Sequence, residues 1–251
     1  MSYESEHLVV DCGPGATYKM VRSGLSPTDV SALLLTHHHF DHTPDAAALM
    51  LTRWESSVGH ERALSVVGPV ATRPFVDALV GPQGAYRPDI TARREAPLSQ
   101  AKYQQHGGVL PRPDLDVDVT ELEPAGGVAL GRWWKISTTA GRHVQPHHKS
   151  LAYRVDLPGR SMAVTGDTEF HPGLVDIAAG ADVLVAMCVD TEERYQAKGP
   201  LRSGQMATGA VNRLAVEADV STVVLTHTGL HLAEPRQRGA GAAGGRRRVS
   251  R

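Results

Sequence analysis

The chain has 251 residues, of which 41% are hydrophobic and 21% charged, as expected of a globular protein rather than a disordered or collagen-like one. A formal net charge of −1 excludes a globally basic nucleic-acid-binding protein, and two cysteines are too few for a disulfide framework. The unusual feature is a total of 13 histidines, because histidine is the commonest metal ligand in proteins.

The first part of the chain alternates between short apolar runs and helical periodicity. It predicts strands at residues 8–10, 32–35 and 64–67, and helices at residues 44–54 and 72–80. Thr43 precedes Pro44, a pair that is typical of an N-cap and the first helical position. Residues 81–127 hold six prolines, so we expect an irregular insertion there, with the role of a lid or a substrate-facing segment.

Regular structure is expected again in the second half. It predicts strands at 133–139, 151–156, 161–165, 182–186 and 222–225, and helices at 172–179 and 205–218, with Pro158 and Gly159 turning a hairpin. This alternation favours one α/β domain over residues 1–235. The tail, 236–251, is rich in Arg, Gly and Ala and is expected to be disordered, with an RNA-contacting tail as the alternative.

Three of the predicted strands end in a similar way, with side chains of the metal-ligating type. The strand at 32–35 leads into His37, the strand at 161–165 leads into Asp167, and the last strand leads into His227. In an open α/β sheet, functional groups collect where the carboxyl ends of the strands open into a crevice. Three such endings therefore predict a site, whereas a capping aspartate and scattered surface histidines would explain only one.

The first ending is the densest. On an extended backbone alternate residues face the same way, so His37 and His39 can reach one point while His38 faces the other way. Asp41 and His42 lie just before the predicted helix, where the chain bends, and can serve a neighbouring point. Imidazoles and carboxylates suit zinc, with manganese and iron as alternatives.

The run His37-x-His39-x-Asp41-His42 resembles the signature of the metallo-β-lactamase fold superfamily, and the motifs around Asp167 and His227 resemble its downstream ligand motifs. The resemblance is strongest to the ribonuclease Z and arylsulfatase-like branch, through Asp11-Cys12-Gly13, Val67-Gly68-Pro69 and Leu151-Ala152-Tyr153-Arg154. It covers about residues 8–234. It implies an α/β (α+β) fold of four αββα layers, with a metal site at one edge between the two sheets.

The resemblance also implies two divalent metal ions, expected to be Zn²⁺, with Mn²⁺ or iron as alternatives. One ion would take His37, His39 and His143; the second would take Asp41, His42 and His227; Asp167 would bridge both. His147 and His148 are the alternatives to His143. We choose His143 because it ends the strand at 133–139, and we interpret the other two as loop residues near the mouth of the site.

Three further residues have expected or open roles. Asp41 is expected to hold or accept the proton of the attacking water. His231 follows His227 by four positions and is either a proton donor or an exposed loop histidine. Asp11 ends its strand near the same crevice and either orients a ligand histidine or caps a turn.

The sequence departs from the branch in several places. Ribonuclease Z-like members carry a His-Glu pair where this chain has Ala186 and Met187, so a helper for protonating the leaving group is missing. The first β-hairpin is expected to be absent before Leu8, and the C-terminus is atypical because the Arg-rich tail replaces the usual last strand. Residues 81–127 have mixed charge and do not read as a tRNA-gripping arm.

These observations favour an esterase-like metallohydrolase, in which a metal-activated hydroxide attacks a small molecule that is a carboxylic ester, lactone, sulfate ester or phosphodiester. The first alternative is a tRNA 3′-processing endoribonuclease, disfavoured by the near-neutral charge and the missing His-Glu pair. The second is a catalytically silent binding module, disfavoured because each ligand position has a candidate. No targeting or membrane-spanning segment is recognised, so a cytoplasmic location is expected, with a homodimer left open.

Overall fold

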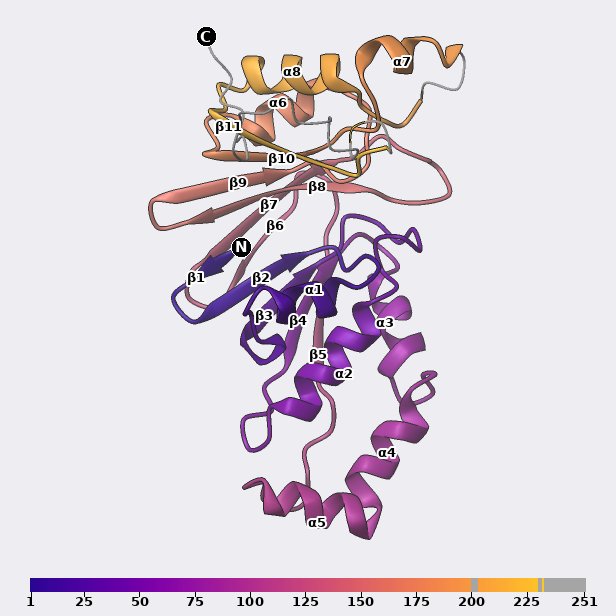
Figure 1. Ribbon diagram of the computed structural model, residues 1–251, viewed down its shortest axis with the longest axis vertical. Helices are drawn as coiled ribbons and strands as arrows, with labels where there is room; N and C mark the ends of the chain where they lie inside the picture. Colours follow the sequence, from indigo (N-terminus) through magenta and orange to yellow (C-terminus); the bar gives the residue numbers. More distant parts are fainter. Residues whose placement is uncertain (200–202, 230–231, 233–251) are drawn as a thin grey trace, which may run out of the picture. The chain divides into compact units, whose positions relative to one another are not determined.

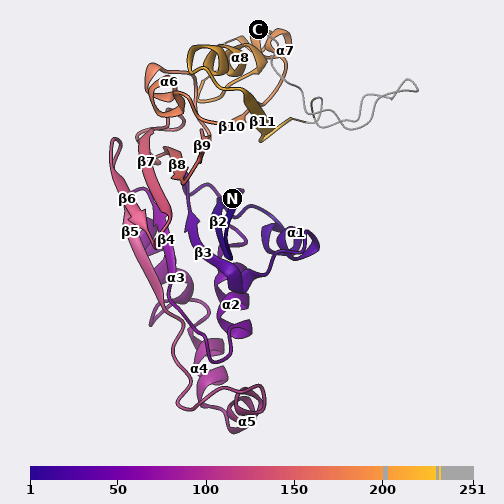
Figure 2. The same cartoon turned by 90° about the vertical axis from the view of Figure 1, so that its left-hand side faces the viewer.

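The computed structural model describes residues 1–199, 203–229 and 232, and the chain divides into two compact units. Unit 1 is Met1–Leu122 and unit 2 is Glu123–Arg251. Each unit has its own β-sheet, its own helices and its own hydrophobic core (Figures 1 and 2). The expectation of a single domain over residues 1–235 stays a prediction, and the tail at 236–251 lies outside the described residues.

Unit 1 contains a five-stranded sheet in the order β1-β2-β3-β4-β5. Its strands are β1 (Ser2–Tyr3), β2 (Glu6–Val10), β3 (Val30–Leu34), β4 (Leu64–Gly68) and β5 (Val117–Glu121). The strands β2 to β5 are parallel neighbours, whereas β1 pairs with β2 in antiparallel fashion. Strands β1 and β2 therefore form a short hairpin over residues 2–10, with Leu8 in its second strand, where the sequence predicted no hairpin before Leu8.

Unit 1 has five α-helices and one 3₁₀ turn among its described residues. They are α1 (Ala16–Arg22), a 3₁₀ turn (Pro27–Asp29), α2 (Ala46–Ser56), α3 (Thr72–Val80), α4 (Arg87–Glu95) and α5 (Pro97–Gln105). Helix α3 packs on β4 and β5. Helix α2 buries Ala46, Leu49, Met50 and Trp54, which recur at the spacing of one helix face, in the core of the unit.

Helix α2 starts later than the sequence indicated. The predicted start was Pro44 with Thr43 as N-cap, but the helix begins at Ala46 after Asp45. The Thr43 hydroxyl instead donates a hydrogen bond to the carbonyl of His39 (3.1 Å), which closes the preceding loop. The Asp45 carboxylate accepts a hydrogen bond from the amide of Thr17 (2.6 Å), so it ties α2 to α1 rather than capping its own helix.

The segment 81–127 is more regular than predicted, because it contains α4, α5 and β5. Two of its six prolines lie at the starts of helices, with Pro88 in the first turn of α4 and Pro97 as the first residue of α5. Proline is tolerated there, because the first amides of a helix have no intrahelical partner. The expectation of irregular structure is therefore wrong for these elements, while the role as a lid stays a prediction.

Unit 2 contains a six-stranded sheet in the order β11-β10-β9-β8-β7-β6. Its strands are β6 (Gly127–Leu130), β7 (Trp134–Ala140), β8 (Leu151–Leu157), β9 (Arg160–Val164), β10 (Val183–Met187) and β11 (Thr222–Thr226). The strands β6 to β9 form an antiparallel meander, in which Leu157 pairs with Arg160 around the predicted Pro158-Gly159 turn. The strands β9, β10 and β11 are parallel, so their carboxyl ends meet at one edge of the sheet.

The helices of unit 2 are α6 (Pro172–Ala178), α7 (Glu192–Gln196) and α8 (Thr208–Glu217). Leu174 of α6, Leu184 of β10 and Leu214 of α8 are buried together in one core cluster, which fixes these helices on the sheet (Figure 1). None of the helices in the described part of the chain is long and apolar enough to cross a membrane.

Candidate metal centre

Four of the predicted ligands lie in the loop between β3 and α2, and we call them the local set: His37, His39, Asp41 and His42. The ring of His37 lies 4.6 Å from that of His39 and 4.2 Å from that of His42, between centroids. The Nε2 atom of His42 lies 3.7 Å from a carboxylate oxygen of Asp41. The loop therefore brings its four ligand-type side chains together within unit 1.

His38 faces the other way, as the alternation of an extended backbone predicts. Its Nε2 lies 2.9 Å from the hydroxyl oxygen of Thr72, and its ring lies against Phe75 of α3 with 5.6 Å between centroids. It therefore packs on α3, and it provides a matched control for its two neighbours.

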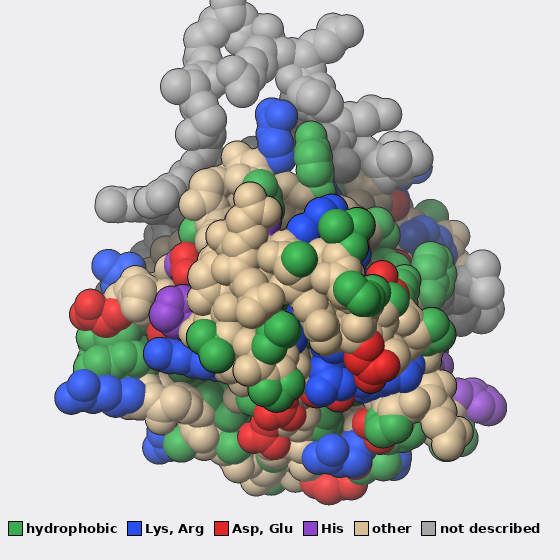
Figure 3. Space-filling view, turned by 90° about the horizontal axis from the view of Figure 1, so that it is seen from below, with side chains coloured by type: hydrophobic (Ala, Val, Ile, Leu, Met, Phe, Trp, Pro, Cys, Tyr) green, Lys and Arg blue, Asp and Glu red, His purple; other side chains and the backbone are tan. Residues whose placement is uncertain are grey.

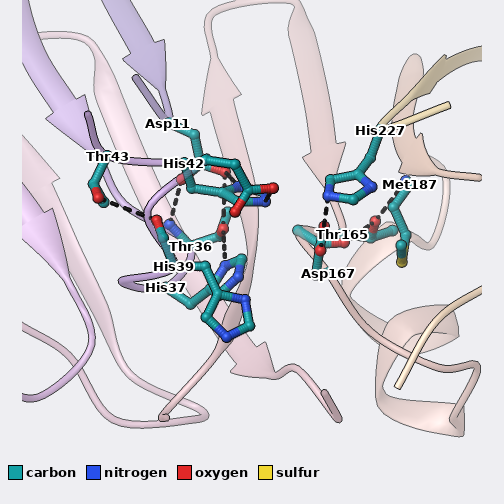
Figure 4. Close-up of polar contacts among 12 residues, drawn as sticks. Asp11, Thr36, His37, His39, His42, Thr43, Thr165, Asp167, Met187 and His227 are labelled. Carbon is teal, nitrogen blue, oxygen red and sulfur yellow. Dashed lines mark hydrogen bonds and ion pairs between the residues drawn. The ribbon is translucent and has the colours of Figure 1, made fainter. Parts of the chain in front are cut away.

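Asp11 fixes the orientation of this loop. Its backbone has a φ of 57°, in the left-handed region that aspartate tolerates better than most residues. One carboxylate oxygen accepts a hydrogen bond from the amide of Thr36 (2.7 Å). The other accepts one from the hydroxyl of Thr36 (2.8 Å) and lies 2.8 Å from Nδ1 of His42 (Figure 4). Both alternatives for Asp11, a turn cap and an orienting partner, are thus met by one side chain.

These contacts set the tautomers of two histidines. Because the carboxylate of Asp11 only accepts, Nδ1 of His42 carries the proton and its Nε2 carries the lone pair. The Thr36 hydroxyl gives its hydrogen to Asp11, so it accepts from Nδ1 of His37 at 3.0 Å, which again leaves the lone pair on Nε2. Metal-binding histidines are commonly oriented in this way by a hydrogen bond from the other ring nitrogen.

The remaining predicted ligands lie in unit 2, and we call them the dispersed set: His143, Asp167 and His227. Asp167 follows β9 and His227 follows β11, two parallel strands that both pair with β10. His227 has a φ of 52°, a backbone conformation that few residues other than glycine adopt and that often occurs at functional sites. Parallel topology therefore brings together residues that are 60 positions apart along the chain.

The dispersed set converges on one carboxylate oxygen of Asp167. It lies 3.1 Å from Nε2 of His227 and 3.8 Å from Nε2 of His143. The side chain of Asp167 is only 4% exposed, whereas that of His227 is 30% exposed (Figure 4). A carboxylate that is this buried and faces two imidazoles is suited to share a cation with them.

The loop that carries His143 is held by the segment that follows Asp167. Nδ1 of His143 lies 2.7 Å from the carbonyl oxygen of Gly204, which can only accept, so the ring lone pair again lies on Nε2. The amide of Arg142 donates to the Thr168 hydroxyl (2.8 Å), and the amide of Glu169 donates to the carbonyl of Arg142 (2.9 Å). These partners were not predicted from the sequence, and the one signal that could have found any of them is the threonine beside Asp167, Thr168.

The alternatives to His143 lie elsewhere. His147 is exposed and His148 is half-buried in the loop before β8, whereas Nε2 of His143 faces the carboxylate of Asp167. His231, the expected candidate for a proton donor, lies outside the described residues.

The donors of both sets fit divalent metal ions. Each set combines neutral imidazole nitrogens with carboxylate oxygens, a mixture that suits zinc and also manganese or iron. His37, His42 and Asp167 are all buried, and burying such groups is costly unless a partner of opposite charge compensates them. In His37, His42 and His143 the fixed tautomer gives Nε2 the lone pair that a metal ligand requires.

The end of β10 is apolar. Ala186 and Met187 are both fully buried, and the Met187 sulfur accepts a hydrogen bond from the amide of Thr168 (3.2 Å). The amide of Met187 in turn donates to the Thr165 hydroxyl at 3.1 Å (Figure 4). These two residues therefore serve to pack the loop beside Asp167, and they contribute no ionisable side chain.

The sequence profile of the metallo-beta-lactamase superfamily matches residues 2–227. The chain belongs to this superfamily. A protein named ribonuclease Z from Mycolicibacterium paratuberculosis (strain ATCC BAA-968 / K-10) is 30% identical over 230 residues, which cover 87% of this chain and 74% of the relative. Another ribonuclease Z, from Mycobacterium sp. (strain KMS), is 32% identical over 187 residues, 70% of this chain and 56% of the relative.

Solved structures show the same fold. The metallo-beta-lactamase fold protein YhfI from Bacillus subtilis superposes with a TM-score of 0.67 at 17% identity, over 91% of this chain and 77% of that protein. Human tRNase Z, short form, superposes with a TM-score of 0.66 at 18% identity, over 92% of this chain and 85% of that protein. The predicted α/β fold of the metallo-β-lactamase type is therefore confirmed, and the chain is a hydrolase of that fold.

Proposed function

We propose that this hydrolase is a metal-dependent endoribonuclease of the ribonuclease Z type, acting on the 3′ ends of precursor tRNA. The observation that carries the proposal is the 30% identity to a protein named ribonuclease Z over 87% of the chain. The sequence favoured a small-molecule ester because the net charge is close to zero. That argument is weak, since total charge says little about how cations are distributed over a folded surface.

In this proposal the local set and the dispersed set supply the ligands of two divalent ions, following the arrangement that the family resemblance implies. One ion would be held by His37, His39 and His143, the second by Asp41, His42 and His227, and Asp167 would bridge them. Two such ions, when bound, supply Lewis acidity that makes a water molecule nucleophilic near neutral pH and offsets negative charge on phosphate oxygens.

The chain's own residues would perform the proton transfer and the positioning. Hydrolysis forms a bond between water oxygen and phosphorus, breaks the bond to the leaving oxygen, and releases a proton from the water. Asp41 is suited to accept that proton, because its carboxylate is 40% exposed and therefore open to solvent, whereas Asp167 is buried. Asp11 and Thr36 would hold His42 and His37 in place while the charge on phosphorus changes.

The direct test compares substrates on the same preparation. Purified protein loaded with zinc or manganese is incubated with a precursor tRNA that carries a 3′ trailer, and separately with p-nitrophenyl acetate and bis(p-nitrophenyl) phosphate. We expect cleavage of the precursor at one position and about two divalent ions per chain by elemental analysis. His39→Ala should abolish cleavage and lower the metal content, whereas His38→Ala should preserve both, because the His38 ring packs on α3.

A second candidate, a hydrolase of small esters or phosphodiesters, is favoured by one observation. Ala186 and Met187 are fully buried and apolar at the place where the ribonuclease branch carries a His-Glu pair. A substrate with a good leaving group needs little protonation of the leaving oxygen, so its hydrolysis would tolerate the absence of that pair. Efficient turnover of p-nitrophenyl acetate with no tRNA cleavage at any salt concentration would reject the proposed function in favour of this candidate.

A further inference from the structure

A cavity of about 600 Å³ lies in unit 1, where the C-terminal end of α2 meets α4 and α5. Its charged lining consists of three cationic side chains, Arg93, Lys102 and Arg112, and one carboxylate, Glu55, with His106 beside them. The three cations are about ten residues apart along the chain, so the sequence shows no basic cluster there. The fold therefore creates a local excess of positive charge that the mixed composition of this segment conceals.

Arg112 is the least expected of these side chains, because it is only 4% exposed. Its guanidinium lies 3.8 Å from the ring centroid of Trp54 and 4.9 Å from that of Tyr103, and its Nη2 lies 2.9 Å from a carboxylate oxygen of Glu55. Its Nε has no hydrogen-bond partner among the described residues. A buried donor of this kind costs free energy unless a ligand accepts from the guanidinium.

One side face of α5 lines the same cavity through Ser99, Lys102, Tyr103 and His106. These positions follow the three- and four-residue spacing of a single helix face, so the fold brings Lys102 to the cavity that Arg112 also lines.

Glu55 holds two of the cations in place instead of neutralising the cavity. One of its oxygens lies 2.8 Å from Nη1 of Arg93, and the other pairs with Arg112. Arg93 is also paired with Asp89 of its own helix, whereas no ion pair of Lys102 is found among the described residues. Lys102 thus remains available to meet a ligand in the cavity that Arg112 also lines.

We propose that this cavity binds a phosphate group. The group has the acceptor oxygens and the negative charge that arginine and lysine side chains recognise together. It could belong to the backbone of an RNA, which rests on the proposed function, or to a small phosphorylated compound, which does not. In the first case α2, about 16 Å long for its 11 residues, would separate the bound phosphate from the loop of the local set.

The surface around the cavity agrees with a single subsite rather than a broad nucleic-acid groove. On the face that carries α5, basic and acidic side chains alternate among the described residues (Figure 3). A phosphate would therefore be recognised by the cavity itself, with little help from long-range attraction.

The test measures binding of inorganic phosphate to the whole protein by calorimetry at low salt, with a 2′-O-methyl RNA hairpin as a second, uncleavable probe. Lys102→Glu places a repulsive charge at the cavity without disturbing a buried group, because Lys102 is exposed. Lys19→Glu, an exposed lysine on α1 of the same unit, is the matched control. We expect Lys102→Glu to weaken phosphate binding by about tenfold or more and Lys19→Glu to leave it unchanged.

The results separate the two sources and the two proposals. Weakened binding of both phosphate and RNA would support an RNA phosphate as the occupant, and weakened binding of phosphate alone would support a small phosphorylated compound. Equal phosphate affinity in the wild type and Lys102→Glu, or no phosphate binding at all, would overturn the site, since phosphate held at the metal centre does not depend on Lys102. Failure to cleave precursor tRNA would instead reject the proposed function and leave the phosphate measurement standing.

Discussion

The local set and the dispersed set reach the same kind of donor arrangement by different routes. The local set comes from six consecutive residues of one loop, and a single carboxylate, Asp11, orients it from the neighbouring strand β2. The dispersed set comes from three separate loops, and its Asp167 and His227 meet because β9 and β11 flank β10 in parallel. The first arrangement depends on local chain geometry, and the second depends on the folding of a whole sheet.

The local set and the dispersed set should therefore be sensitive to different changes in the structure. A contiguous loop keeps its ligands near one another even when its surroundings change, because few residues separate them. Asp167 and His227 have no such restraint, so loss of pairing among β9, β10 and β11 would separate them. Loss of a predicted ligand from either set should therefore have the largest effect on activity, whereas variants of the residues that orient the local set, Asp11 and Thr36, should have graded effects.

The largest effect is expected for Asp167→Ala. Asp167 is the residue on which both histidines of the dispersed set converge, so its loss leaves no carboxylate between them. Activity should fall below detection and the metal content should fall with it, as measured by elemental analysis and substrate cleavage. Asp176→Ala, an exposed carboxylate on α6, is the control and should behave like the wild type. Full metal content in the Asp167 variant would show that the two histidines suffice.

A large effect is also expected for His143→Ala, with His147→Ala as its comparison. His143 faces Asp167 and is held by Gly204, whereas His147 is exposed. Loss of a direct ligand should exceed the roughly 10–100-fold loss that removal of a partner behind a ligand produces. Metal titration and turnover of both variants would measure this, and a dead His147 variant beside an active His143 variant would reverse the assignment.

A smaller, graded effect is expected for Asp11→Asn. Asparagine tolerates the positive φ of this position, so the backbone should stay in place while the carboxylate charge is lost. The tautomers of His37 and His42 both depend on that carboxylate. We therefore expect activity and metal affinity to fall by about 10–100-fold.

The Thr36 side chain provides the matched pair for the same chain of hydrogen bonds. Thr36→Ser keeps the hydroxyl between Asp11 and His37 and should be nearly neutral, whereas Thr36→Val removes it and should follow Asp11→Asn in direction. A change in thermal stability with unaltered metal affinity in both Asp11→Asn and Thr36→Val would contradict an orienting role.

The sequence allowed much of this architecture to be predicted, because short-range patterns determine it. The strands at β2, β3, β4 and β8 to β11 were expected within a few residues of where they lie, and α3 was expected at its observed bounds. His37, His39 and His38 were sorted correctly onto two sides, because alternation along an extended backbone is a property of the chain itself. Whether the ligands hold metal stays a prediction.

Other features depend on long-range packing and could not be predicted from pattern. The prolines of 81–127 were interpreted as breakers, although a proline in the first turn is equally compatible with a helix. Arg93, Lys102 and Arg112 are distant in sequence, so only the packing of α4 and α5 on α2 brings them to one cavity. The role of Gly204 beside His143 depends on a contact across 61 residues.

The smallest expected effect concerns His171, a buried residue of unit 2 that precedes α6. His171 is 5% exposed, and burial is the main reason that its pKa is lowered, while a hydrogen bond with the backbone of Ala140 acts in the opposite direction. The unfolded chain therefore takes up a proton at this residue near pH 6.5, before the folded protein does. Stability should accordingly be unaffected above that pH and should decline as the pH falls below it, until the folded residue is also protonated.

His171→Asn retains a side-chain donor for Ala140 but has no group that titrates in this range. Thermal unfolding of the wild type at about pH 7.5 and about pH 5.5 should show a larger drop in midpoint than the variant shows over the same interval. His106→Asn, an exposed histidine in unit 1, is the control and should retain the drop of the wild type. If the His171 variant loses as much stability on acidification as the wild type, the acid sensitivity originates elsewhere, and the buried imidazole is only a packing element under α6.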